Sequence, residues 1–324
     1  MSDWRSRRDQ ALSVLDREKR RETRIDAAHV LRDLAREQRQ AASEFRSAID
    51  GLLGDPEPEV RRAGLQVAGA VLPPEELEPL LVARLSDPLA LIRITAIGAL
   101  ADLERPSARG ALASAANDED FSARFEAARG LAALGSSAGL QALIDALERD
   151  DLRFRAVGAL ANLGDPASLP AIQRLFHRLM LPPFERTQAA GAMAKLGDPE
   201  GGQHLLKRTH RRWSLDRAFA IELCGDVQVS GALERLLEIL CDVADPYRGT
   251  AARGLGRLRD PRALEPLIHL FEEAGISEEL RLDAAEGLCL LGIPQARARL
   301  ESALGGWASS SMREALEQLL EAYR

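Results

Sequence analysis

The chain has 324 residues, of which 46% are hydrophobic, 29% are charged and only 4% are aromatic, and its formal net charge is -7. The low aromatic content predicts a core of Leu and Ala, two strong helix formers, and the acidic balance argues against a surface that is basic all over and binds nucleic acid. Three cysteines are too few for a disulfide framework, and no apolar stretch approaches the roughly 18 residues of a membrane span.

The first 50 residues contain two highly charged amphipathic segments. Trp4, Leu12 and Leu15 lie on one face of the first segment, and Ile25 and Leu34 lie on one face of the second. A terminal repeat needs a solvated outer face because no neighbour covers it. We therefore expect residues 1–50 to form degenerate capping helices.

Residues 51–300 repeat one pattern, in which an apolar residue and an Arg precede a run of small residues. The copies are Val60–Leu65, Ile92–Leu100, Ala123–Leu131, Leu152–Ala156, Glu185–Ala190, Tyr247–Ala252 and Leu280–Ala285. Their spacing of roughly 28 to 34 residues is the length of a helix pair in a stacked array. Apolar segments with helical periodicity lie upstream of these copies, at Leu77–Leu85, Leu140–Leu147, Leu169–Leu175, Leu233–Leu240 and Leu264–Phe271. We interpret the Arg segments as inner helices and the upstream segments as outer helices.

Turn signals separate these segments. Asp-Pro pairs such as Asp87-Pro88 lie between an outer and an inner segment, and triplets such as Gly164-Asp165-Pro166 lie before the next outer segment. Gly ends a helix in the left-handed conformation, Asp caps the next helix, and Pro is tolerated in the first turn. The copy at residues 214–226 lacks an Arg at its expected place. Residues 301–324 close the array with a polar-faced capping helix over residues 311–323.

Together these features predict an all-α, right-handed α-α superhelix of about eight or nine helix pairs in one domain, residues 1–324. The pattern Asp-Pro-x-x-x-apolar-Arg-x-x-Ala, followed by Ala-Leu-x-x-Leu-Gly-Asp-Pro, resembles HEAT repeats over residues 40–300. It resembles in particular the short HEAT-like repeat also found in phycobilin lyases. The resemblance implies a structural ladder of Asp and Arg six positions apart, with the pairs Asp55 and Arg61, Asp87 and Arg93, and Asp118 and Arg124. Members of this family include adaptors, transport receptors, lyase subunits, a hydroxylase and a DNA glycosylase, so the resemblance selects no function.

The inner helices carry the main candidate binding surface. Residues one, five and nine positions after each Arg share one helix face, which we expect to line a concave groove. The candidate partner-binding residues are Ile94, Phe125, Arg129, Phe154, Asn162, Lys195, Arg253 and Arg257. An apolar strip bordered by positive charge is suited to a protein partner, either an amphipathic helix or an extended acidic segment. Alternatively, both Phe side chains fill gaps between layers.

A basic run supplies the alternative site, an anion or nucleic-acid patch made of Lys207, Arg208, Arg211, Arg212 and Trp213. Residues 166–220 hold nine Lys and Arg against four Asp and Glu. Such a run can bind phosphates, with the indole as a stacking platform. We place it on an outer helix, where a simply solvated helix face is the competing interpretation.

No pattern predicts catalysis, a metal or a cofactor. His29, His177, His204, His210 and His269 are scattered, and none precedes Glu, as the His-Glu dyads of HEAT-type hydroxylases would require. Cys224, Cys241 and Cys289 lie on or beside apolar stripes and are expected in the core. A non-catalytic scaffold is therefore the leading hypothesis, and an accessory subunit of a lyase or other enzyme is a further alternative.

The cellular setting is predicted from composition. The charged N-terminus lacks a secretory apolar region, and the few cysteines fit a reducing cytosol. All but three of the 43 cationic side chains are Arg, a bias typical of a GC-rich bacterial genome. We expect a cytoplasmic bacterial protein.

Overall fold

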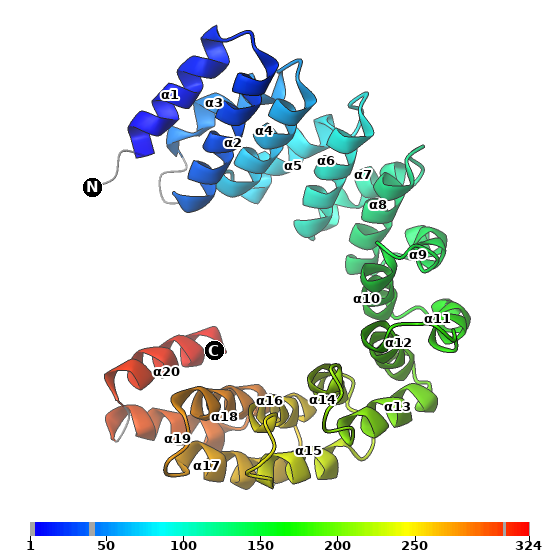
Figure 1. The fold of residues 1–324 in the computed structure, drawn as a ribbon, viewed down its shortest axis with the longest axis vertical. Helices are drawn as coiled ribbons and strands as arrows, with labels where there is room; N and C mark the ends of the chain where they lie inside the picture. Colours follow the sequence, from blue (N-terminus) through cyan, green and yellow to red (C-terminus); the bar gives the residue numbers. More distant parts are fainter. Residues whose placement is uncertain (1–3, 39–42, 307–308, 324) are drawn as a thin grey trace. The chain divides into compact units, whose positions relative to one another are not determined.

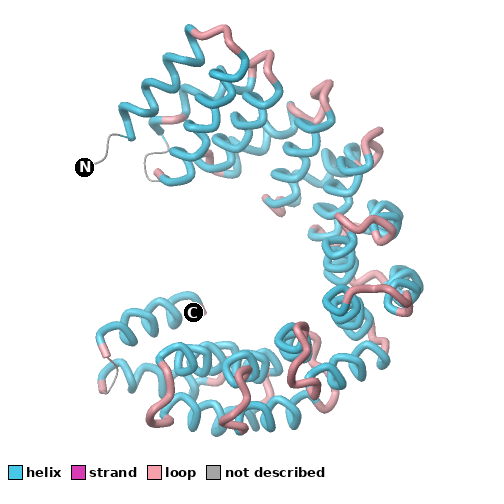
Figure 2. Tube along the Cα trace, viewed as in Figure 1, coloured by secondary structure: helices cyan, strands magenta, loops and turns pink. Residues whose placement is uncertain are grey.

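The computed structural model describes residues 4–38, 43–306 and 309–323. Every regular element in these residues is a helix, as predicted (Figures 1 and 2). The helices form two compact units, residues 1–148 and 149–324, and each unit has its own hydrophobic core. The interpretation of residues 1–324 as one continuous solenoid stays a prediction.

The first unit contains an outer and an inner row of helices. The outer row comprises α1 (Trp4–Arg17), α3 (Arg46–Leu53), α5 (Pro74–Ala83), α7 (Arg109–Ala115) and α9 (Leu140–Ala146). The inner row comprises α2 (Arg21–Glu37), α4 (Pro58–Val71), α6 (Ala90–Asp102) and α8 (Phe121–Ala133). Short 3-10 turns, Pro106–Ala108 and Ser137–Gly139, precede α7 and α9. Each inner helix packs against the next inner helix, and the core between the rows consists mainly of Leu and Ala.

The second unit repeats this arrangement. Its inner row comprises α10 (Arg153–Leu163), α12 (Pro183–Lys195), α14 (Arg217–Asp226), α16 (Arg248–Leu258), α18 (Glu278–Leu291) and α20 (Ser310–Ala322). Its outer row comprises α11 (Leu169–Phe176), α13 (Pro199–Thr209), α15 (Ala232–Cys241), α17 (Leu264–Glu272) and α19 (Pro294–Gly305). The 3-10 turns Pro166–Ser168 and Pro261–Ala263 precede α11 and α17. The predicted helix stops are present: Gly164 ends α10 in the left-handed conformation at φ 68°, and the Asp165 side chain accepts the Ala167 N–H at 2.9 Å.

The two ends of the chain differ from each other. The second N-terminal segment is a regular inner helix, because Arg24 of α2 pairs with Asp55 and donates to the carbonyl of Leu15 at 3.0 Å. At the other end, α20 buries only the stripe of Met312, Leu316 and Leu320, and its role as a capping helix stays a prediction.

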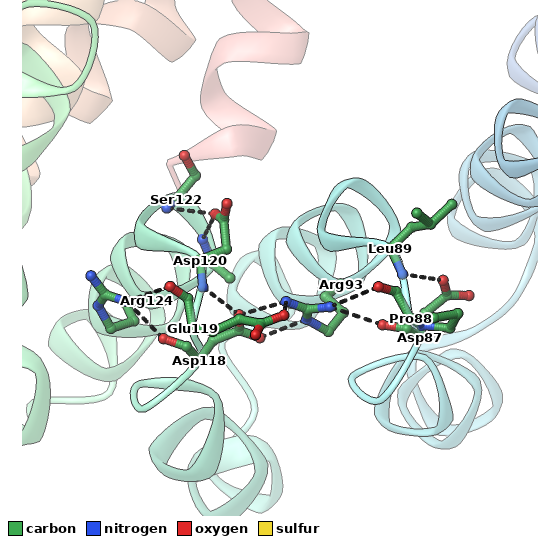
Figure 3. Close-up of polar contacts among 10 residues, drawn as sticks. Asp87, Pro88, Leu89, Arg93, Asp118, Glu119, Asp120, Ser122 and Arg124 are labelled. Atoms are coloured by element: carbon green, nitrogen blue, oxygen red, sulfur yellow. Dashed lines mark hydrogen bonds and ion pairs between the residues drawn. The ribbon is translucent and has the colours of Figure 1, made fainter.

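The ladder of Arg and Asp joins consecutive layers (Figure 3). Arg93 donates Nε and Nη2 to the Asp118 carboxylate, both at 2.8 Å, and Nη1 to the carbonyl of Asp87 at 3.0 Å. Asp118 also accepts the Asp120 N–H at 2.8 Å, and its pKa is lowered, chiefly by the hydrogen bond from Arg93. Arg61 repeats the pattern with the Asp87 carboxylate at 3.1 and 3.2 Å. The resemblance paired each Arg with the Asp six positions earlier, but that Asp contributes its backbone carbonyl, and the carboxylates bound by Arg61 and Arg93 come from the following repeat.

The ladder also includes an Arg in the copy at residues 214–226, where the sequence pattern indicated none. Arg217 of α14 is 1% exposed, donates Nη1 to Asp245 at 2.9 Å, and donates Nε to the carbonyl of Thr209 at 2.7 Å. The prediction that this copy lacks the Arg was wrong. The residue before Arg217 is Asp216 instead of an apolar residue, and this substitution hides the repeat.

Asp216 joins three elements around this Arg. It is fully buried, accepts the Thr187 hydroxyl of α12 at 2.5 Å, and pairs with Arg208 of α13. Burial alone would raise the pKa of Asp216, but the hydrogen bonds from Arg208, Ser214 and Thr187 outweigh it and lower the pKa to about 2.

We predict that Asp118→Asn lowers the free energy of unfolding by about 3 kcal/mol, because Arg93 keeps its burial but loses its charge partner. The control is Glu119→Gln: Glu119 also lies 3.1 Å from Arg93, but its side chain is 86% exposed, so the expected loss is below about 1 kcal/mol. Urea unfolding followed by circular dichroism measures both. Equal losses would show that the ladder does not depend on the buried carboxylate.

We also predict an acid-dependent contribution from Asp216. Its pKa is about 2 in the folded chain, below the ordinary Asp value of about 3.9, so its ionised form stabilises the fold above about pH 4. That contribution is lost as the pH falls toward 2. The difference in unfolding free energy between the wild type and Asp216→Asn should therefore shrink on acidification, measured by urea titrations from pH 7 downward. A difference that stays constant with pH contradicts this assignment.

Candidate functional site

Some of the predicted groove positions face the neighbouring inner helix. A Cβ at Gly98 of α6 would lie 3.7 Å from the Glu126 carboxylate of α8, and a Cβ at Gly249 of α16 would clash with Asp283 of α18. Inner helices stack side by side, so these two residues, five and one positions after the Arg, meet the next layer. Small residues at these positions permit the close approach.

Phe125 was wrongly predicted to be a surface anchor. It is 0% exposed and lies in the core, whereas Ile94 is half-buried and packs against the core of the first unit. Phe154 of α10, by contrast, is 46% exposed. The gap-filling interpretation therefore holds for Phe125 and not for Phe154.

Phe154 belongs to an aromatic cluster on three consecutive inner helices. The ring of Phe219 in α14 lies 6.2 Å, between centroids, from both Phe154 of α10 and Phe184 of α12. Phe184 is 45% exposed and Phe219 is half-buried. Phe184 and Phe219 fall outside the predicted column because they lie two positions before and two positions after the Arg of their helices. Their shared signal is an aromatic residue in the first turn of an inner helix.

The predicted positive border is largely compensated by acids. Arg129 contacts Asp102 at 2.7 Å and Glu126 at 2.9 Å, and Arg257 lies 3.3 Å from Asp226. The carboxylates around Arg253 are Asp283, Glu222 at 3.6 Å and Glu286 at 4.0 Å. Lys195 donates to the Asn162 amide oxygen at 3.1 Å, and both residues are exposed. The inner face therefore offers an exposed aromatic cluster with little free positive charge at the predicted arginines.

The basic run spans a helix end and a turn. Helix α13 ends at Thr209, so Arg211, Arg212 and Trp213 lie in the turn and not on an outer helix as predicted. Arg208 pairs with Asp216, and Arg212 donates to the carbonyl of Ala244 at 2.6 Å. Lys207 and Arg211 are exposed, and Trp213 is 91% exposed. Arg208 and Arg212 of the predicted anion patch are thus engaged in contacts within the protein.

Burial shifts the pKa of His204, Cys224 and Cys289, which lie outside these surfaces. Burial, reinforced by the positive charges of Arg208 and Arg186, lowers the pKa of His204 to about 4, and its ring meets Phe176 edge-on at 5.0 Å. Burial raises the pKa of Cys224 to about 12 and that of Cys289 to about 11. Cys241 is exposed, so its predicted place in the core was wrong.

Within residues 4–38, 43–306 and 309–323, no three His, Cys, Asp or Glu side chains gather closely enough to hold a metal ion. None of the helices in these ranges combines the length and the apolarity needed to cross a bilayer.

Comparisons with solved structures show weak similarity in fold. The complex of CpcE and CpcF of phycocyanin lyase from Nostoc sp. PCC7120 aligns at 21% identity over 76% of this chain and 94% of the other, with a TM-score of 0.46. Kap121p aligns at 12% identity over 98% of this chain and 46% of the other, with a TM-score of 0.48. Human deoxyhypusine hydroxylase aligns at 19% identity over 77% and 96%, with a TM-score of 0.33. Scores this low carry no argument about function.

Family models give the clearer result. No curated protein matches the sequence. The model described as HEAT repeats matches residues 78–154 and 213–289, and the PBS lyase HEAT-like repeat matches residues 152–177. These segments cover the ladder residues Arg93, Asp118 and Arg217, whose contacts tie the helix pairs together. The chain belongs to the HEAT-repeat family.

Proposed function

We propose that this protein is a non-catalytic scaffold or adaptor that binds a segment of a protein partner along its inner helices. One observation carries the proposal: Phe154, Phe184 and Phe219 form an aromatic cluster on α10, α12 and α14. Two of these rings keep nearly half of their surface exposed. Exposed aromatic side chains on a rigid surface are typical anchors of protein interfaces.

The surroundings of the cluster favour an amphipathic helix as the bound segment. The arginines expected to attract an acidic segment are engaged by carboxylates, as the contacts of Arg253 and Arg257 illustrate. A helix that presents apolar residues at i, i+3 or i+4 and i+7 could place them against the rings. The extended acidic segment is the less supported choice.

The two alternatives make different demands on this chain. Nucleic-acid binding would rely on Lys207, Arg211 and Trp213, since Arg208 and Arg212 contact acids of the protein itself. An accessory subunit of a lyase or another enzyme would use the same protein-binding surface. Only the identity of the bound protein separates that role from a general adaptor.

The test compares the wild type with Phe154→Asp/Phe184→Asp. We expect the double change to weaken binding to the captured partner at least about 100-fold, because two apolar anchors become charged. Partners are captured from native lysate, identified by mass spectrometry and then titrated as purified proteins by calorimetry. Circular dichroism should show an unchanged helical content, since both rings are partly exposed.

Val82→Asp on α5 is the matched control, because Val82 is 40% exposed and lies on an outer helix. It should bind the partner as the wild type does. Equal affinity of the wild type and the double variant, or an equal loss in Val82→Asp, would contradict the assignment of the aromatic cluster.

A further inference from the structure

Three turns of the second unit carry apolar side chains at their tips. These turns, residues 177–182, 210–216 and 242–247, lead from α11 to α12, from α13 to α14 and from α15 to α16, and we name them the apolar turns (Figures 1 and 2). Their exposed fractions are high: Leu179 94%, Met180 93%, Trp213 91%, Leu215 86% and Val243 76%. Exposed apolar side chains gathered on one edge mark an interaction site more often than isolated ones.

Hydrogen bonds place the apolar turns side by side. Arg186, in the first turn of α12, donates to the carbonyl of Arg178 at 2.7 Å, and the next residue, Thr187, donates to Asp216. The second and third turns are joined by Arg212, which donates to the carbonyl of Ala244. The three turns that carry the five apolar side chains are therefore neighbours in the second unit.

Each apolar turn is anchored by a buried residue. Leu181 is buried in the first turn, Asp216 in the second and Asp245 in the third. Asp216 and Asp245 are held by the paired arginines Arg208 and Arg217. Because the anchors point inward, the tips between them project into solvent.

Positive charge accompanies the tips. Lys207 and Arg211 are exposed and form no ion pair within the described residues, and the exposed acid of the third turn, Asp242, lies 3.4 Å from Arg212. The buried acids Asp216 and Asp245 already have guanidinium partners. The edge thus combines protruding apolar side chains with uncompensated cations.

The repeat itself does not require apolar tips. In the first unit, the turn at residues 54–57 reads Gly-Asp-Pro-Glu, and the turn at residues 116–120 reads Ala-Asn-Asp-Glu-Asp. Those two turns contain the same anchoring Asp, at Asp55 and Asp118, but no large apolar side chain. The apolar tips are therefore an addition to the ladder and not part of it.

We propose that the apolar turns bind the interface of an anionic lipid bilayer, with the five apolar side chains inserted between headgroups. Trp favours the level of the headgroups, Leu, Met and Val reach the acyl boundary, and Lys207 and Arg211 attract anionic lipid. A folded protein would need a separate pocket for each protruding tip, whereas a fluid interface accepts them without matching their shape. This peripheral contact places the scaffold at a membrane surface and does not depend on the aromatic cluster.

The experiment uses the full chain and two kinds of extruded vesicle, phosphatidylcholine alone and phosphatidylcholine with about 30 mol % phosphatidylglycerol. In flotation at about 150 mM salt, we expect binding to the anionic vesicles that is about 10-fold or more tighter than to the neutral ones. Brominated acyl chains should quench tryptophan fluorescence in the bound protein. Trp213→Phe should lose most of that quenching.

Leu179→Ser/Met180→Ser/Leu215→Ser should lose vesicle binding by about 30-fold or more, because three inserted side chains become polar. The matched control is Val82→Ser/Leu89→Ser, which alters partly exposed apolar residues of the first unit and should bind as the wild type does. Lys207→Glu/Arg211→Glu should remove the preference for anionic lipid. Phe154→Asp/Phe184→Asp should still bind vesicles, which separates this proposal from the protein-binding surface.

Three results would overturn the proposal. One is the absence of binding to anionic vesicles. Another is a Trp213 response to a single-stranded oligonucleotide but not to vesicles, which would assign the edge to nucleic acid. The third is self-association in sedimentation equilibrium that the triple Ser variant abolishes, which would assign the edge to a second copy of the chain.

Discussion

The fold of each unit depends on arginines that each form hydrogen bonds in two consecutive layers at once. In Arg93, one side of the guanidinium holds the carbonyl of Asp87, which closes the turn of its own repeat, and the other side binds the carboxylate of Asp118 in the next repeat. Because the group is planar and has five donors, a single side chain can make both sets of contacts. The same arrangement in Arg217 shows that it extends to the second unit.

This use of arginine shapes the remaining surface. Many arginines that seem available in the sequence are engaged by carboxylates or carbonyls, so charge counts overstate the positive potential of the inner face. What stays exposed there is apolar and aromatic, notably Phe154 and Phe184. In the turn anchored by the buried Asp216, the nearby residues Trp213 and Leu215 stay exposed. The same short turns therefore contain both residues of the structural ion pairs and candidate binding residues.

Family membership limits the function less than these surfaces do. HEAT repeats supply a rigid, extended framework in which each layer needs contacts only with its neighbours. Substitutions at exposed positions then cost little stability, so different surfaces can serve different partners on the same framework. In this chain the aromatic cluster and the apolar turns occupy different elements of the second unit, the inner helices and the turns that precede them. The two surfaces can therefore be altered separately.

The sequence alone determined the helices, their order and the repeat, because periodic Leu and Ala, Asp-Pro turns and Gly stops act over a few residues. It also pointed to Trp213, although it placed the side chain on a helix. Only the tertiary structure decided exposure: Phe125 and Phe154 both follow a repeat Arg, yet one is 0% and the other 46% exposed. It also decided that Asp118 pairs with the Arg of the preceding repeat. Both outcomes depend on the distance between neighbouring helices. That distance is set by the packing of side chains that lie far apart in the sequence, so no local pattern encodes it.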